Sequence, residues 1–413
     1  MSTQSWKKTA AMFLTGQSLS MFGSMLVQYA MMWHITLTFQ SGIYMTIFII
    51  CGFLPTFFIS PFAGVWADRF SKKTIIMLAD GMIALSTLIL AIIFMSGYEE
   101  VWLLFVMALI RGLGQGIHTP AIGAILPEFI PEDKLMRVNG IYGSIHAIII
   151  FAAPIASAGL LSVTTLSNIF FIDVITAILA ILTVLFFVHI PKKEKLSAKE
   201  EKISYLADFK LGLKYIQNHA FLKPLFIFLG LFLILMAPSS FLTPLQVARS
   251  FGEDVWRLTA LEIVFSIGMM LGGILLSTWG GFKNRIKTML LATFWLCICT
   301  ALLGLIPNFY LYLAVMGLIG IGIPLINTPF SVLLQEKVDS EYIGRVFGIF
   351  PMVSTSAMPI GMLIFGPLSD TMSIENIMVI TGVISLLVAF VFAQNKKLKQ
   401  AGEQTRKKEA EAI

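Results

Sequence analysis

The sequence predicts an all-α integral membrane protein with twelve transmembrane helices in two six-helix repeats. Of its 413 residues, 57% are hydrophobic and only 13% are charged, and the mean hydropathy is +0.87. Apolar runs of about twenty residues recur along the whole chain, and each is long enough to cross roughly 30 Å of hydrocarbon as a helix. Basic residues gather in alternate connections between the runs, and one sequence pattern occurs twice.

Each apolar run between polar breaks is predicted to be one membrane-spanning helix. The runs cover residues 9–38, 42–66, 74–96, 101–127, 138–163, 165–190, 223–248, 257–280, 288–306, 308–333, 346–370 and 374–394. This pattern predicts an N-terminal six-helix bundle at 1–190, a cytoplasmic linker at 191–222, a C-terminal six-helix bundle at 223–394 and a cytoplasmic tail at 395–413.

The basic residues predict the orientation. Of the 29 Lys and Arg, all except Arg111, Arg249 and Arg257 lie at the chain ends or in the even-numbered connections. Because Lys and Arg accumulate on the cytoplasmic side of membranes, both termini are expected to be cytoplasmic. The net charge of +6 therefore reflects topology, and we expect no nucleic-acid partner.

The longest polar connection divides the chain six spans from six. Within it Leu206, Phe209, Leu213 and Ile216 recur at helical spacing, which predicts an amphipathic helix on the cytoplasmic face. The halves share a pattern, because HTP at 118–120 and NTP at 327–329 each lead through an acidic loop to an Arg-Val pair. Parallel repeats of this kind predict a substrate cavity near mid-membrane and alternating access to it.

The connection between the second and third spans has an unusual charge density. It reads GVWADRFSKK from Gly64, with Asp68, Arg69, Lys72 and Lys73 as its charged side chains. It resembles the G-x-x-x-D-R-x-x-x-K signature of the major facilitator superfamily. The resemblance implies that the acid and the arginine form a charge network against the end of the eleventh span, which acts as a conformational latch.

The likeness extends over all twelve spans, and the chain is most similar to the macrolide-efflux branch of the drug and proton antiporters in that superfamily. The segments that carry it are GFLP at 52–55, RGLGQGIHTPA at 111–121, FIDV at 171–174, LEIVFSIGMMLGGILL at 261–276 and GRVFGI at 344–349. The fifth-span antiporter signature appears as APIASA, in which Pro154 survives as a helix kink and the usual glycines do not.

A charge inside a predicted span costs roughly 2.5–3.5 kcal/mol without a partner or a function, and four charged residues are candidates for such a role. Arg111 and Asp173 lie at depths of approximately 15 and 12 Å, which allows either a structural ion pair or a role in coupling or substrate binding. Glu262 is interpreted as a proton carrier or as an interfacial glutamate. Asp80 is expected to join the latch network or to face interfacial water, and proton coupling is its alternative.

The first span carries a polar stripe beside large flexible side chains. Gln17, Ser24 and Gln28 share one side of the predicted helix, with Met31 and Met32 near its end. Such a stripe can line a substrate cavity, because methionine adapts its shape to bulky ligands, or it can form an ordinary helix seam. His118 in the fourth span is interpreted either as a proton relay or as a packing residue.

These features predict a proton-coupled exporter of hydrophobic or amphipathic compounds, an antibiotic such as a macrolide among them, in a bacterial cytoplasmic membrane. The alternatives are a nutrient importer or uniporter, and a lysolipid flippase, of the same fold. The sequence has no H-E-x-x-H, G-x-S-x-G or phosphate-binding G-x-x-x-x-G-K motif, so we expect no enzyme activity and no ATP-driven pump. We expect a monomer in the lipid bilayer, driven by protons, without a cofactor or metal.

Overall fold

The computed structural model describes residues 3–188, 205–339 and 341–395, and every regular element in those ranges is a helix. Twelve segments in the described ranges are helices long enough and apolar enough to span a membrane. The predicted all-α class and its number of spans are therefore confirmed.

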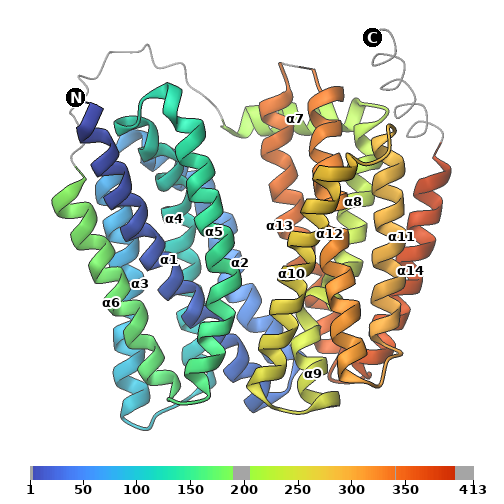
Figure 1. The fold of residues 1–413 in the computed structure, drawn as a ribbon, viewed down its shortest axis with the longest axis horizontal. Coiled ribbons are helices and arrows are strands. Elements are labelled where there is room, and N and C mark those ends of the chain that lie inside the picture. Colours follow the sequence, from blue (N-terminus) through green and yellow to red (C-terminus); the bar gives the residue numbers. More distant parts are fainter. Residues whose placement is uncertain (1–2, 189–204, 340, 396–413) are drawn as a thin grey trace. The chain divides into compact units, whose positions relative to one another are not determined.

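The described residues form two compact units. The first holds residues 3–40, 44–188 and 254–259, and the second holds 41–43, 205–253 and 260–395. Figure 1 shows the long helices of each unit running side by side. The helices before the linker are α1 (Thr3–Phe39), α2 (Gly42–Arg69), α3 (Lys72–Met95), α4 (Val101–Phe129), α5 (Glu132–Leu161) and α6 (Leu166–Phe187). The later elements are α7 (Tyr205–Asn218), α8 (Leu222–Ala237), the π-helical turn η1 (Pro238–Leu242), α9 (Thr243–Phe251), α10 (Val255–Trp279), α11 (Arg285–Leu303), α12 (Phe309–Lys337), α13 (Ile343–Leu368) and α14 (Ile374–Gln394).

The same helix neighbours recur in both units. In the first unit α1 packs against α5 and α6, while α3 packs against α4 and α6. In the second unit α8 packs against α13 and α14, while α11 packs against α12 and α14. When spans are counted along the chain, each pair in the second unit is the first-unit pair shifted by six. The sequence repeat is therefore a repeat of packing as well.

Glycines allow two equivalent helix pairs to approach closely. A Cβ atom on Gly112 of α4 would lie 2.3 Å from the carbonyl oxygen of Gly52 on α2. One on Gly320 of α12 would lie 2.3 Å from the carbonyl oxygen of Phe265 on α10. The hydroxyl of Thr56 also donates a hydrogen bond across the first contact, to the Gly112 carbonyl at 2.7 Å. Small residues of this kind are the usual contact between membrane helices, because they let the backbones pack directly.

A matched pair of variants tests the contact at Gly112. Gly112→Ala is expected to destabilise the protein by about 1–3 kcal/mol, because α2 and α4 must move apart to admit a methyl group. Gly123→Ala on the same helix is the control, since an added Cβ there meets nothing within 4 Å. Thermal unfolding in detergent should show a lower Tm for the first variant alone. Equal Tm values for the two variants would show that the close approach is unimportant.

The predicted linker helix is present as α7, and part of it packs on α13. Ile216 is buried, and Gly212 lies against Ile349 and Arg345 of α13, where a Cβ would be only 2.9–3.1 Å from their side chains. Phe209 and Leu213, expected on the apolar face, are exposed, and the side chain of Leu206 lies outside the described residues. The helix therefore packs on α13 through the row that contains its glycine.

Candidate functional site

Arg111 and Asp173 form a buried ion pair in the interior of the first unit. Arg111 Nη1 lies 2.5 Å from Asp173 Oδ2, and both side chains are at most 5% exposed. Arg111 Nη2 donates to the Ser24 carbonyl at 2.7 Å, and the Ser24 hydroxyl donates to Asp173 Oδ1 at 2.9 Å. The Thr87 hydroxyl adds a hydrogen bond to Asp173 Oδ2 at 3.1 Å. We call Ser24, Thr87, Arg111 and Asp173 the Arg111 layer, and its two opposite charges are fully paired.

Asp80 belongs to a second buried cluster on the same helices. Asp80 is 4% exposed, and its Oδ1 atom accepts from the Ser20 hydroxyl at 3.2 Å and lies 3.3 Å from His118 Nε2. His118 Nε2 also lies 2.9 Å from Gln17 Oε1. We call Gln17, Ser20, Asp80 and His118 the Asp80 layer. The expectation that Asp80 faces interfacial water is wrong, because its helix turns this side chain towards α1 and α4.

The polar stripe of α1 forms a helix seam. Gln17 is 1% exposed in the Asp80 layer, and Ser24 is 8% exposed in the Arg111 layer. Met31 is also fully buried, whereas Gln28 and Met32 are partly buried. Gln17 and Ser24 bond to α4 and α6 of the same unit, which favours the helix-seam alternative for them, while a cavity role of Gln28, Met31 and Met32 stays a prediction.

The two lysines at the end of the GVWADRFSKK stretch bind to neighbouring helices of the first unit. Lys72 Nζ lies 2.6 Å from Glu128 Oε1 on α4. Lys73 Nζ donates to the carbonyls of Leu185 and Val188 at 2.8 and 2.9 Å, which places a cation on the free carbonyl groups at the end of α6. The sequence reasoning missed both partners.

The other half of the same stretch contains the residues that are predicted to form the latch. Gly64 lies on α2 with nothing within 4 Å of an added Cβ. The backbone of Asp68 and Arg69 is helical, but their side chains lie outside the described residues. Whether they form the predicted charge network therefore stays a prediction.

The proline of the antiporter signature lies in the interior of α5. Pro154 is buried, and the helix continues past it from Glu132 to Leu161. Proline cannot donate a backbone hydrogen bond and crowds the preceding turn, which is the physical basis of the predicted kink.

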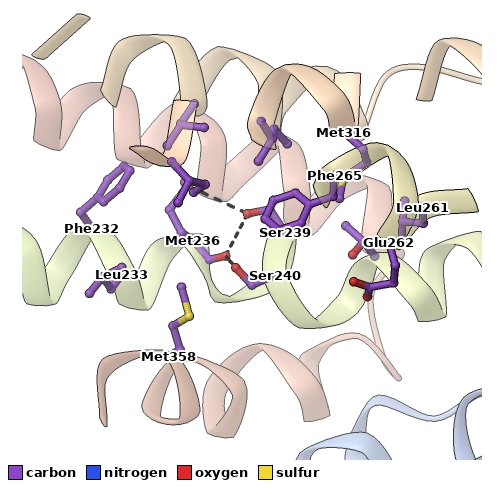
Figure 2. A pocket seen from close by; sticks show the side chains of 14 residues that line it. Phe232, Leu233, Met236, Ser239, Ser240, Leu261, Glu262, Phe265, Met316 and Met358 are labelled. Atoms are coloured by element: carbon purple, nitrogen blue, oxygen red, sulfur yellow. Dashed lines mark hydrogen bonds between the residues drawn. The ribbon is translucent and has the colours of Figure 1, made fainter. Parts of the chain in front are cut away.

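A pocket opens in the second unit where the seventh span departs from α-helical geometry. The π-helical turn at Pro238–Leu242 separates α8 from α9, and such turns are frequent at functional sites. The hydroxyls of Ser239 and Ser240 donate back to the Met236 carbonyl at 2.9 and 3.2 Å. Figure 2 shows these serines beside Met358 and Glu262 at the pocket. Its lining residues are Phe232, Leu233, Met236, Ser239, Ser240, Thr243, Leu261, Glu262, Phe265, Leu296, Met316, Ile319, Ile323 and Met358.

Glu262 is the only ionisable side chain that lines this pocket. It is partly buried, and it makes no hydrogen bond or ion pair with any residue in the described part of the chain. The other lining residues are apolar, methionine or hydroxyl side chains, and the cavity measures about 170 Å³. This volume is below the roughly 300–1,000 Å³ of complete ligand pockets, so it fits one group of a large molecule.

Asp370 organises a cluster of donors in the second unit that sequence reasoning did not single out. It lies between α13 and α14, and its carboxylate accepts from Ser41 Oγ at 2.7 Å and from the backbone N–H groups of Gly42 and Ile43 at 2.8 and 3.0 Å. Arg249 Nη2 lies 2.8 Å from Oδ1 of the same carboxylate. Burial opposes its ionisation, but the hydrogen bonds from Ser41, Ile43, Gly42 and Arg249 outweigh burial and lower the pKa of Asp370.

This lowered pKa gives a prediction about acid stability. Because the folded protein favours ionised Asp370, its stabilising contribution is complete above the ordinary aspartate pKa of about 3.9 and is lost as the pH falls through the lower folded value. Asp370→Asn is therefore expected to lower Tm at pH 7, and the difference from the native protein should shrink below about pH 4. Thermal unfolding in detergent across this range measures the difference. A constant gap between the two proteins would rule out the carboxylate charge as its cause.

Each of the two units thus contains an acid within a membrane-spanning helix that has unused hydrogen-bonding capacity. Asp80 Oδ2 has no hydrogen-bond partner among the described residues, and Glu262 has none for either oxygen. Such carboxylates can bind a proton or pair with a cationic group. The described part of the chain contains no group of three or more His, Cys, Asp or Glu side chains that could hold a metal ion.

Known proteins with related sequences and folds are transporters. A macrolide efflux protein A of Streptococcus pyogenes is 28% identical over 390 residues, which cover 94% of this chain and 95% of the relative. A macrolide efflux protein A of Enterococcus faecalis is 31% identical over 315 residues, which cover 75% of this chain and 96% of the relative. The crystal structure of a bacterial homologue of the human lysosomal transporter Spinster matches with a TM-score of 0.70 at 14% identity, covering 98% of this chain and 99% of that one. The family model of the Major Facilitator Superfamily matches residues 11–362. Together with the twelve spans and the repeated packing, this match shows that the chain belongs to the major facilitator superfamily of transporters.

Proposed function

We propose that this protein is a proton-driven exporter of large amphipathic compounds, antibiotics such as macrolides among them. In this proposal it works in the cytoplasmic membrane of a bacterium, with both termini in the cytoplasm. The names of the two macrolide efflux relatives support the class of compound. Family membership supports alternating access as the transport mode.

The observation that carries the proposal is the unpartnered carboxylate of Glu262 in an otherwise uncharged pocket. A lone charge in hydrocarbon is costly, so this group is stable when a proton or a cationic group neutralises it. Its neighbours Met236, Met316 and Met358 are flexible and polarizable, which suits a binding surface for varied apolar groups. A basic group of the compound and a proton would therefore compete for one carboxylate, which is the simplest means of exchanging the two.

The conformational cycle in this proposal includes the latch implied by the superfamily signature. Asp68→Asn is expected to impair export while leaving compound binding largely intact, because the substitution removes the charge of the latch and not a pocket residue. Asp133→Asn serves as the control, since Asp133 is an exposed acid of the same unit paired with Lys134. Binding to purified protein and efflux from cells should be measured together. Equal loss of both in a folded Asp68→Asn protein would contradict the latch.

A cell assay tests the function as a whole. A bacterium deficient in its own drug pumps should become less susceptible to a macrolide when it expresses this protein, and the cells should retain less of a radiolabelled macrolide. A protonophore should abolish the difference, because export draws on the proton gradient. Increased accumulation of the macrolide in energised cells would indicate import and contradict the proposal.

A further inference from the structure

The Asp80 and Arg111 layers are built from the same three helices at one fixed spacing. On each of α1, α3 and α4, one residue of the Asp80 layer and one residue of the Arg111 layer are seven positions apart, or about two helical turns. The pairs are Gln17 and Ser24 on α1, Asp80 and Thr87 on α3, and His118 and Arg111 on α4. Ser20 is a second α1 residue in the Asp80 layer, and Asp173 adds α6 to the Arg111 layer. The two layers are therefore comparable sites that differ in chemistry.

Their charges differ in one respect. In the Arg111 layer an arginine, which keeps its charge at all ordinary pH values, stands opposite Asp173, so the layer is permanently neutral. At the equivalent position on α4, the Asp80 layer has His118, whose imidazole can be neutral or can carry an added proton. When Asp80 is ionised, the Asp80 layer therefore carries one negative charge. The layer becomes neutral only after it has taken up one proton.

The hydrogen bonding of the Asp80 layer is also incomplete. Asp80 Oδ2 and Gln17 Nε2 are buried, and neither has a partner among the described residues. Asp80 and Gln17 are 4% and 1% exposed, so bulk water does not compensate them. A buried carboxylate with one unused oxygen and only neutral donors is unstable, and a proton on the adjacent imidazole supplies the missing countercharge.

The surroundings leave His118 as the natural proton acceptor. The titratable groups that face Asp80 are His118 from α4 and Tyr142 from α5, while α1 contributes Gln17 and Ser20. The acid on α6, Asp173, is already paired with Arg111. His118 Nε2 faces two oxygen atoms, and in the tautomer that has its hydrogen on Nε2 the Nδ1 atom is left to accept the added proton. The His118 side chain is 18% exposed, so it is not sealed inside the unit as Asp80 is.

We propose that the Asp80 layer is a proton-binding site of its own, in which His118 carries the proton and Asp80 is its countercharge. The site lies in the first unit, whereas the Glu262 pocket lies in the second, and it rests on the proposed proton-driven function. Uptake transfers one proton from water to the imidazole, which becomes imidazolium, and release returns that proton to water. Two separate protonatable sites would allow the protein to bind a proton whether or not a compound occupies the Glu262 pocket.

Histidine NMR on the purified full chain tests this site in the absence of any compound. The chain has five histidines, and His118→Gln identifies the signal that belongs to His118. This signal should titrate between pH 5 and 9, and Asp80→Asn should move its midpoint to lower pH by about one unit or more, because the countercharge is gone. The pH dependence of export should move in the same direction. His146→Gln is the control and should change neither readout.

Several results would overturn the inference. One is a native His118 signal that does not titrate in this range, which decides the matter even if Asp80→Asn fails to fold. A second is a titration midpoint of the His118 signal that is the same in the native protein and in Asp80→Asn. A third is a His118 signal that responds to sodium and not to pH. Because no compound is present, these results are independent of the export assays. Failure here with protonophore-sensitive export intact would remove this site alone.

Discussion

Replacing Arg111 by alanine is expected to destabilise the first unit by about 3–5 kcal/mol, because Asp173 would remain buried without a countercharge. Asp173→Asn should have a similar effect for the converse reason. Both groups are nearly inaccessible to water, with the pair at 2.5 Å. Equilibrium or thermal unfolding in detergent measures the loss.

A double variant separates structure from transport at this pair. Removing both charges together, as in Arg111→Met with Asp173→Leu, should recover most of the lost stability, since replacing a whole buried ion pair by apolar residues is often neutral. The Arg111 layer already satisfies its charges within the unit, so the double variant should also recover export. If the double variant were stable but did not export, the purely structural role of the Arg111–Asp173 pair would be contradicted. The pair would then have a direct part in transport.

Substituting Glu262 by glutamine is expected to abolish proton-coupled export while preserving the fold. Glutamine keeps the size and polarity of the side chain but cannot exchange a proton, so one carrier of the coupling is lost. Glu262 has no structural partner among the described residues, and its replacement should therefore leave Tm nearly unchanged. Efflux of a macrolide from cells at several external pH values checks the first expectation, and unfolding of the purified variant checks the second.

The matched control for this substitution is Glu100→Gln. Glu100 precedes α4 as an exposed residue whose side chain makes no capping hydrogen bond, so the same chemical change there should affect neither export nor stability. Unaltered pH-dependent efflux in Glu262→Gln would remove this residue from the mechanism.

The number of spans could be predicted from the sequence because it depends on the length of the apolar runs. The Arg111–Asp173 contact could be predicted because it depends on the depth of the two residues in the membrane. Hydrophobic runs count the helices, and equal depth in the membrane brings two charges within reach of one another. Helix ends were harder to predict, since α5 begins at Glu132, six residues before the apolar run that predicted it. Charged residues in the first turn of a helix do not interrupt it, although they do interrupt a hydropathy pattern.

The direction in which side chains point could be predicted only as alternatives. Gln17 and Ser24 were predicted to line a cavity or to form a helix seam, and Asp80 to join the latch network, to face interfacial water or to couple protons, because periodicity gives the side of a helix and not what that side faces. The contacts of Lys72 and Lys73 with α4 and α6 depend on helix neighbours that only the fold supplies. The π-helical turn at Pro238 had a signal, a proline followed by two serines inside an apolar span, but this pattern is also compatible with an ordinary proline kink.

The most direct measurement of the central claim is proton movement caused by the exported compound. Energised inside-out membrane vesicles, which have an acidic lumen, should be prepared with a fluorescent pH indicator inside. If protons leave the lumen as the compound enters, adding a macrolide should raise the lumenal pH in vesicles containing this protein and not in those containing Glu262→Gln. Accumulation of the macrolide without any change in lumenal pH would contradict proton-driven export.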